Sequence, residues 1–203
     1  MATAAEDRIV ELQRRLLGGY QLLQTLVGIR LRAVDDPDSR RHLTWLSDVT
    51  AAMELISRRM TAEGPLDFAA YLDDVAGFWA RACQGRPVRI DVRGQSTLLP
   101  DSHILPLAII THELISNAVR HAFPDGRNGS IAVAFSRAIG GVSLVVRDSG
   151  VGADAVEPGE GLALVSGLVE HLGGSMTVET APGRGVGVRI RLPLDATRTV
   201  LTH

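Results

Sequence analysis

Apolar residues recur at spacings of three and four through the first sixty positions of the chain. They occupy positions 9, 12, 16, 20, 23 and 27, and then 43, 46, 49, 53, 56 and 60. This period predicts two amphipathic helices. Asp35-Asp36-Pro37-Asp38-Ser39 between them predicts the turn of an αα-hairpin. Further apolar residues on the first helix favour a four-helix bundle formed with a second copy. The alternative is a hairpin packed only on its own chain.

Beyond Glu63-Gly64-Pro65 the pattern becomes a mixture of helical and alternating segments. Helices are predicted at about 66–84, 112–123 and 160–173, and strands at 88–92, 130–137, 142–148, 175–180 and 186–193. Strands in this mixed order, with helices on one face, predict an α+β protein whose second part is a two-layer α/β sandwich. We therefore expect a hairpin domain at 1–63, a larger domain at 64–195 and a flexible tail at 196–203.

One predicted helix, His112–Phe123, carries the clearest indication of chemistry. Residues four apart are neighbours on a helix surface, so Glu113, Asn117 and His121 form one polar stripe. The apolar residues of the segment fall largely on the other side. An acid and an amide one turn apart suit Mg2+ and a polyphosphate, because hard cations prefer oxygen ligands. The alternative is a polar face that is only solvated.

Two glycine-containing segments follow this helix. Asp148 ends a β-type apolar run and precedes Gly150 and Gly152, and its carboxylate can accept a hydrogen bond from an exocyclic amine such as that of adenine. Gly159 and Gly161 begin the next predicted helix, where free N–H groups and the helix dipole favour phosphate. A turn or a helix cap would explain either motif alone, but their order along the chain indicates a nucleotide site.

The composition narrows the class of protein. The chain has 203 residues, of which 45% are hydrophobic, and a net charge of −2 without a basic block. Neither nucleic acid nor an anionic membrane surface is therefore an expected partner. The single cysteine, Cys83, excludes an intramolecular disulfide and fits a reducing compartment. With no long apolar run and no secretion signal in the first seven residues, we expect a cytoplasmic protein.

The segments from His112 onward resemble the ATP-binding domain of bacterial sensor histidine kinases, whose ATPase fold is shared with gyrase and the ninety-kilodalton chaperone. His112–Phe123 resembles the N box of that family. Asp148–Gly152 and Gly159–Leu162 resemble its two glycine boxes, and Gly183–Gly187 resembles its closing glycine motif. The four boxes occur in the family's order, and the resemblance covers roughly residues 66–193.

The resemblance implies ATP and Mg2+ as ligands and a role for each matching residue. Asn117 would coordinate Mg2+, and Glu113 would order or activate the water or acceptor near the γ-phosphate. Asp148 would hold the adenine amine, and Arg120 stands where the family often has lysine near the phosphates. The other residues expected at the nucleotide are His121, Gly150, Gly152, Gly159, Gly161 and Leu162.

The chain departs from the family's pattern at two places in this domain. Val186 stands where threonine or serine is common, so a hydroxyl contact is missing. The segment Ala153–Pro158 has six residues where relatives often carry a long nucleotide lid. A short lid covers the phosphates poorly, which predicts weak or rapidly exchanging nucleotide.

The hairpin resembles the dimerisation and phosphoacceptor region of one histidine kinase subfamily, which reads roughly His-Arg-Val-Lys-Asn-Asn-Leu-Gln. This chain reads Arg14-Arg15-Leu16-Leu17-Gly18-Gly19-Tyr20-Gln21, so Arg14 stands where the phosphorylated histidine is expected. A guanidinium stays protonated and is no nucleophile, whereas imidazole offers a neutral nitrogen. No histidine lies on the first helix; His42, at the start of the second, is an alternative acceptor.

The leading hypothesis is an ATP-binding, histidine-kinase-like signalling protein that lacks its own acceptor. It would form a homodimer through residues 5–62 and act on a response regulator or another histidine kinase, by binding or by phosphorylation in trans. One alternative is a Ser/Thr kinase of the anti-sigma-factor type, against which the hairpin counts. Another is an active histidine kinase with a non-standard acceptor such as His42.

Overall fold

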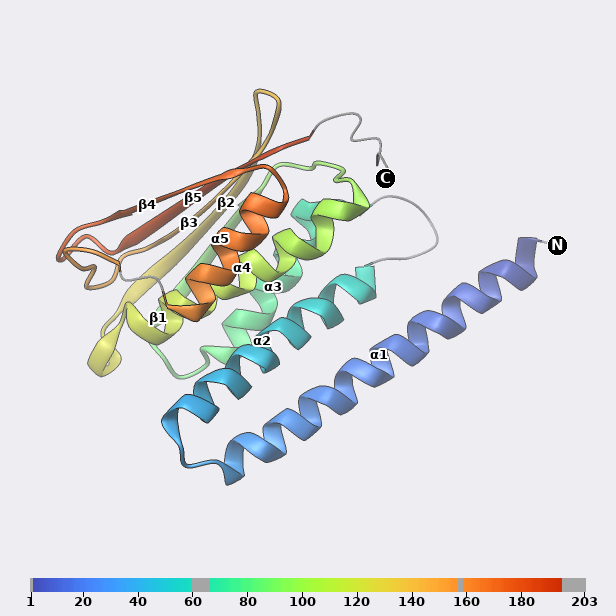
Figure 1. Ribbon diagram of the computed structural model, residues 1–203, viewed down its shortest axis with the longest axis horizontal. Helices are drawn as coiled ribbons and strands as arrows, with labels where there is room; N and C mark the ends of the chain where they lie inside the picture. The colour runs from blue at the N-terminus through green and yellow to red at the C-terminus, as the bar shows by residue number, and fades with distance from the viewer. Residues whose placement is uncertain (1, 60–65, 157–158, 195–203) are drawn as a thin grey trace, which may run out of the picture.

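The computed structural model describes residues 2–59, 66–156 and 159–194. Two helices lead into a five-stranded sheet that carries three helices on one face (Figure 1). The predicted α+β class and two-layer sandwich are confirmed. The predicted tail at 196–203 lies outside the described residues. No helix in these ranges combines the length and apolarity needed to cross a membrane.

The hairpin consists of α1 (Ala2–Ala33) and α2 (Pro37–Arg59). Asp36 stabilises the start of α2, because its carboxylate accepts a hydrogen bond from the backbone N–H of Ser39 at 2.8 Å. Pro37 occupies the first helical position, where no N–H partner is needed. The turn chemistry thus places the two helices side by side (Figure 1).

The sheet has the strand order β1-β2-β3-β5-β4. Its strands are β1 (Val88–Gly94), β2 (Gly129–Ala138), β3 (Gly141–Asp148), β4 (Ser175–Thr180) and β5 (Val186–Pro193). The β1–β2 pair is parallel and the other pairs are antiparallel. Apolar side chains alternate toward the helices, as in β2, where Ile131, Val133 and Phe135 are buried and the residues between them are exposed.

Three helices cover the inner face of the sheet: α3 (Phe68–Ala82), α4 (Asp101–His121) and α5 (Glu160–His171). Helix α4 starts eleven residues before the predicted segment and contains Pro106. Proline removes one helical hydrogen bond, but burial of Ile104, Leu107 and Ile110 holds this first part of the helix in the core. The helix ends before Pro124, which begins a short 3-10 turn at Pro124–Gly126.

Helix α2 packs on α4, so the hairpin lies against the sandwich (Figure 1). Ala52 and Ile56 of α2 belong to the same buried cluster as the apolar residues of α3 and α4. The guanidinium of Arg59 donates two hydrogen bonds to the carboxylate of Asp74 in α3, one of them at 2.8 Å. Helix α1 lies on the side of α2 that faces away from the sheet.

Candidate functional site

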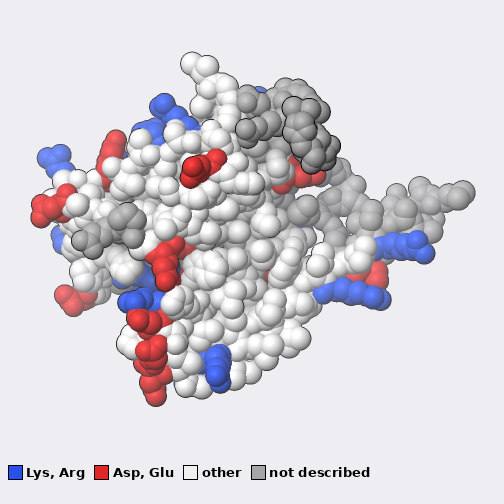
Figure 2. Space-filling view, viewed as in Figure 1, with Lys and Arg blue, Asp and Glu red and all other residues white. Residues whose placement is uncertain are grey.

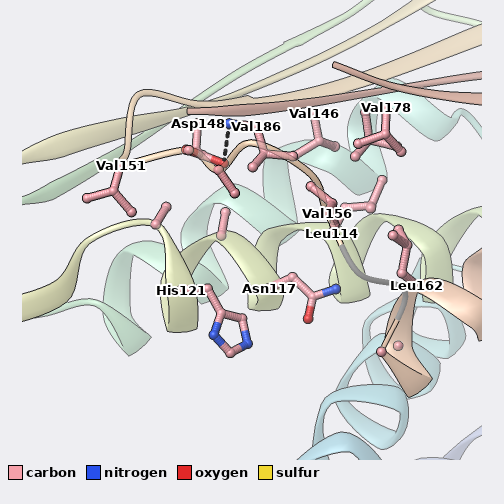
Figure 3. A pocket seen from close by; sticks show the side chains of 17 residues that line it. Leu114, Asn117, His121, Val146, Asp148, Val151, Val156, Leu162, Val178 and Val186 are labelled. Atoms are coloured by element: carbon pink, nitrogen blue, oxygen red, sulfur yellow. Dashed lines mark hydrogen bonds between the residues drawn. The ribbon is translucent and has the colours of Figure 1, made fainter. Parts of the chain in front are cut away.

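A cavity of 440 Å3 lies between α4, α5 and the sheet. Its wall is mainly apolar and includes valines of β3, β4 and β5. Figure 3 shows Asp148 among these valines at the sheet, while Asn117 and His121 project from α4. The lining residues are Leu114, Asn117, Ala118, His121, Ala122, Val146, Asp148, Val151, Gly152, Ala153, Val156, Gly159, Gly161, Leu162, Val178, Val186 and Val188.

Asp148 provides the buried acceptor on the sheet side of the cavity. It is 6% exposed at the end of β3. One carboxylate oxygen accepts a hydrogen bond from the N–H of Gly150 at 2.8 Å, and the other accepts from the N–H of Val186 at 3.2 Å. Burial raises the pKa of Asp148, while these backbone bonds act in the opposite direction. Each oxygen keeps a lone pair that can accept a hydrogen bond from a ligand amine.

Glycines allow the loop after Asp148 to approach its neighbours. A Cβ on Gly150 would lie 2.2 Å from the carbonyl oxygen of Ala122, and Gly152 has φ +61. A Cβ on Gly185 would lie 2.7 Å from a carboxylate oxygen of Asp148. Gly152 lines the cavity, whereas Gly150 lies beside it and lets the loop meet the end of α4.

Glu113 is buried rather than part of a solvated stripe. It is 1% exposed, and neither carboxylate oxygen has a hydrogen-bond partner in the described part of the chain. Burial raises the pKa of Glu113 to about 7; nearby Arg120 lowers it and Asp48 raises it further. A Cβ on Gly161 would lie 2.6 Å from a Glu113 oxygen, so this glycine of α5 makes room for the carboxylate.

The remaining polar residues of α4 do not all reach the cavity. Asn117 and His121 line it, but Glu113 and Arg120 are not among the lining residues. Arg120 extends instead toward α2, where its Nη2 lies 3.6 Å from an oxygen of Asp48. Sequence reasoning missed Asp48, because no local pattern indicates that α2 covers this side of α4.

The start of α5 forms another part of the wall. Gly159 is the N-cap and has no side-chain oxygen to occupy the first amides of the helix. Gly159, Gly161 and Leu162 all line the cavity. Free amides at the positive end of a helix suit an anionic group. The predicted lid, Ala153–Pro158, is described only as far as Val156.

The donor set fits Mg2+ when a polyphosphate supplies further ligands. In the described residues no group of three or more His, Cys, Asp and Glu side chains could hold a metal ion. The Glu113 carboxylate has no partner, and its neighbour Gly161 also lies against the amide of Asn117, with 3.6 Å from the Cβ position to Oδ1. Both side chains offer the oxygen ligands that Mg2+ prefers.

Arg14 lies apart from this constellation. It belongs to α1, and its guanidinium pairs with Glu11 at 3.3 Å, with its side chain 76% exposed. His42, by contrast, contacts the start of α5: its Nε2 lies 3.0 Å from an oxygen of Glu160. The side chain of Val186 lines the cavity, and its N–H supports Asp148.

Residues 103–196 match the family described as histidine kinase-, DNA gyrase B-, and HSP90-like ATPase. The chain is 26% identical over 202 residues to sensor histidine kinase PdtaS of Mycobacterium tuberculosis (strain ATCC 25618 / H37Rv), covering 92% of this chain and 39% of that protein. It is 26% identical over 204 residues to blue-light-activated histidine kinase 1 of Erythrobacter litoralis (strain HTCC2594), covering 94% of this chain and 56% of that protein. The chain thus spans only part of these relatives.

The fold is also that of a solved histidine kinase. The histidine kinase domain from the Erythrobacter litoralis EL346 blue-light activated histidine kinase superposes with a TM-score of 0.67 at 22% identity, covering 86% of this chain and 96% of that domain. The full EL346 kinase gives 0.71 at 21% identity, over 95% of this chain and 62% of the other. Residues 103–196 thus form a histidine kinase-type ATPase domain, and the similarity of the chain to bacterial sensor histidine kinases extends through hairpin and sandwich alike.

Proposed function

We propose that the chain binds MgATP in the cavity between α4, α5 and the sheet, and that it acts in signalling on a partner rather than on an acceptor at position 14. Two buried carboxyl groups carry this proposal: Asp148 lines the cavity on its sheet side, and Glu113 of the cavity-lining helix α4 has no hydrogen-bond partner within the described ranges. Asp148 accepts from the adenine amine, and the apolar wall packs on the base. The phosphates lie at the start of α5.

Glu113 and Asn117 hold the charged end of the nucleotide. Glu113 and Asn117 are the residues that would hold Mg2+, which would supply positive charge to neutralise the phosphates. A cation held beside Glu113 would favour its ionised form, because a nearby positive charge lowers the pKa of a carboxyl group. Its position beside Gly161 also suits it to accept a proton from an acceptor group near the γ-phosphate.

Isothermal titration with MgATP tests the site. Asp148→Asn and Asn117→Ala are each expected to weaken binding about tenfold to a hundredfold, because each removes a hydrogen bond or metal ligand involving a charged group. EDTA should weaken the wild type but leave Asn117→Ala nearly unchanged. Asp154→Asn, which removes an exposed acid outside the cavity wall, is the matched control. Unchanged affinity in both site variants would refute the assignment.

The loss of the usual acceptor is supported by the chemistry at Arg14. Its guanidinium is paired with Glu11 and exposed on α1. Because the guanidinium stays protonated, it offers no neutral nitrogen that could attack the γ-phosphate. Labelled ATP alone should leave no acid-labile phosphate on the wild type. The variant Arg14→His tests whether the sandwich can transfer phosphate to a histidine at this position. Self-labelling of that variant, but not of the wild type, would support the proposal.

A homodimer is supported by the outer surface of α1. Six apolar side chains there are at least half exposed: Leu12, Leu16, Leu22, Leu23, Leu26 and Ile29. Figure 2 shows a largely uncharged stretch along α1 between charged side chains nearer its two ends. Such a row fits a second copy in a four-helix bundle.

Sedimentation velocity tests the dimer. Leu23→Glu places a charge in the middle of this row and should shift the protein toward monomer, because an unpaired charge is costly in an apolar interface. Ile139→Glu changes a fully exposed apolar residue at the β2–β3 turn and should leave the mass unchanged. A wild type that is monomeric at all concentrations would contradict the dimer.

The partner we propose is a response regulator or another histidine kinase. Matches of 92% and 94% of the chain, which include the hairpin, favour this class over the Ser/Thr kinase alternative. Incubation with ATP and candidate proteins should yield phosphate that is labile in acid on the partner. Acid-stable phosphate on serine or threonine would favour the alternative instead.

A second candidate is autophosphorylation at His42. It is favoured by the 3.0 Å contact between His42 Nε2 and Glu160, which lies between two cavity-lining glycines. In this case labelled ATP would give phosphohistidine on the wild type and none on His42→Ala. That result would replace the lost-acceptor proposal while leaving the nucleotide site intact.

A further inference from the structure

Arg120 connects the phosphate end of the site with the hairpin. Its Nε donates to the carbonyl oxygen of Ser116 at 3.3 Å, and its Nη2 lies 3.6 Å from Asp48 Oδ2. The hydroxyl of Ser116 donates to the same Asp48 oxygen at 2.5 Å. The guanidinium is therefore aimed at α2 and not at the cavity.

Asp48 makes more than a loose surface pair. Its side chain is only 14% exposed, and Ser116 is 3% exposed, so both lie inside the contact between α2 and α4. A buried carboxylate needs donors or a cation to offset the loss of water. Ser116 supplies a donor and Arg120 a cation. If the Arg120 side chain turned toward the cavity, Asp48 would keep only the hydrogen bond from the Ser116 hydroxyl.

A nucleotide would need the same guanidinium. The base is proposed at Asp148, so its phosphates lie at the side of the cavity formed by Asn117 and the start of α5. Arg120 is three residues from Asn117 and next to His121, both of which line the cavity, so it is on the adjoining face of α4. The chain contains no lysine, so a permanent positive charge for a phosphate must come from arginine.

We infer that Asp48 and the phosphates of a bound nucleotide compete for Arg120, so that docking of α2 on α4 weakens phosphate binding and phosphate binding loosens α2. The inference rests on the proposed ATP site and describes its regulation. Asp48 is a positioning residue, since it acts through Arg120. By linkage, the two effects are equal in size. A partner that pulls the hairpin away therefore raises the affinity for nucleotide.

A second contact ties α2 to the same region. His42 pairs with Glu160 at the first residue of α5. The two contacts lie six residues apart on α2, so they hold the helix at two points against the polar edge of the site. Both partners of this outer contact are exposed, 58% and 77%, so it contributes less than the inner one.

A double-mutant cycle with two ligands tests the competition. Affinities of MgATP and of adenosine are measured for the wild type, Asp48→Asn, Arg120→Ala and the double variant. Asparagine keeps the shape and can still accept from Ser116, so the fold is preserved. Asp48→Asn should tighten MgATP about threefold to tenfold, the range of coupling between neighbouring charged residues. It should leave adenosine unchanged and have no effect once Arg120 is alanine.

Hydrogen exchange supplies the reciprocal readout. MgATP should increase exchange of the α2 amides around Asp48 in the wild type, and adenosine should not. Asp38→Asn, an exposed acid on the same helix, is the matched control and should change neither ligand.

Equal effects of Asp48→Asn on both ligands, or an undiminished effect in the Arg120→Ala background, would overturn the competition. So would weaker MgATP binding in Asp48→Asn. If instead neither ligand binds any of the proteins, the proposed nucleotide site itself is wrong. MgATP binding that depends on Asp148 but is insensitive to the Asp48–Arg120 cycle refutes this inference alone.

Discussion

At the scale of single residues, His112 and Glu113 are adjacent and buried, and burial shifts their pKa values in opposite directions. His112 lies against the rings of Phe78 and Trp79, with centroids 5.5 and 5.9 Å away, and its nitrogens have no hydrogen-bond partner in the described ranges. Burial lowers its pKa to about 3 and raises that of Glu113 to about 7. Each residue thus favours its neutral form in the folded protein.

The two shifts have opposite consequences for stability. Below pH 6.5 an unfolded His112 takes up a proton that the folded protein refuses, so stability falls as the pH falls toward 3. Above pH 4.5 an unfolded Glu113 loses a proton that the folded protein keeps, so stability falls as the pH rises toward 7. Between pH 4.5 and pH 6.5 the two pH dependences of stability oppose each other, so single variants are needed to separate them.

Glu113→Gln should stabilise the nucleotide-free protein in a pH-dependent way. At pH 5 both side chains are neutral when folded, so the difference is small; at pH 8 the variant gains on the order of 1–3 kcal/mol. Urea unfolding at the two pH values measures this. Glu170→Gln, at an exposed position of α5, is the control. A gain that does not grow with pH would show that the carboxyl is ordinarily solvated.

His112→Phe should remove the acid-side loss. The wild type is expected to lose about 2 kcal/mol from this residue between pH 7 and pH 5, because the unfolded histidine is protonated there and the folded one is not. The variant should lose that much less in the same urea titrations. His171→Gln alters an exposed histidine and should follow the wild type. Parallel pH curves for wild type and His112→Phe would contradict the burial argument.

At the scale of elements, α5 contains two glycines with different surroundings. A Cβ on Gly161 would reach within 2.6 Å of Glu113, whereas one on Gly167 would meet nothing within 4 Å. Alanine favours a helix over glycine. The tertiary structure therefore requires glycine only at position 161 of these two, because the Glu113 carboxylate of α4 leaves no room for a Cβ there.

The two glycines form a matched pair for mutation. Gly167→Ala should stabilise the protein by about 0.5–1 kcal/mol and leave MgATP binding unchanged. Gly161→Ala should displace the Glu113 carboxylate and weaken Mg2+-dependent ATP binding about tenfold, as loss of a supporting contact at a metal site commonly does. Urea unfolding and titration calorimetry separate the effects. Equal behaviour of the two variants would mean that Gly161 is only a helix residue.

At the scale of the whole molecule, α2 belongs to two layers. Its Ile56 is 3% exposed in the core that α3 and α4 share, and Arg59 pairs with Asp74 of α3. The other side of α2 packs on α1, and none of the α1 side chains that the structure describes belongs to that core. The hairpin and the sandwich are therefore expected to lose stability together.

Ile56→Ala should lower the free energy of unfolding of the sandwich by about 2–5 kcal/mol, because it leaves a cavity in the shared core. In a Trp45→Phe background the fluorescence of Trp79 in α3 reports on the sandwich alone, and far-ultraviolet circular dichroism reports on all helices. Both midpoints should move together. Leu46→Ala, 41% exposed on the same helix, should change stability by less than about 0.5 kcal/mol. A shift in the helical signal alone would show independent units.

Much of this fold could be predicted because the patterns that indicate its helices and strands involve residues close together in the sequence. The period of apolar residues indicated α1 and α2, and alternation and turns indicated β4 and β5 to the residue. Glycines near Asp148 and at the start of α5 have a fixed spacing, and the structure gathers most of the residues so identified around one cavity. The first part of α4 was not predicted, because Pro106 opposes a helix locally and only burial against the core offsets it.

By itself, the sequence determined the helical hairpin, the order of elements and the polar residues of α4, and it predicts that Arg14 stands at the position of the usual acceptor. Each of these depends on side chains a few positions apart or on one residue's own chemistry. The tertiary structure decided the environment of those residues: it buried Glu113 beside Gly161 and turned Arg120 toward Asp48. Burial and these contacts depend on segments about fifty to seventy residues away in the sequence, and the contacts set the pKa values and charges of the residues.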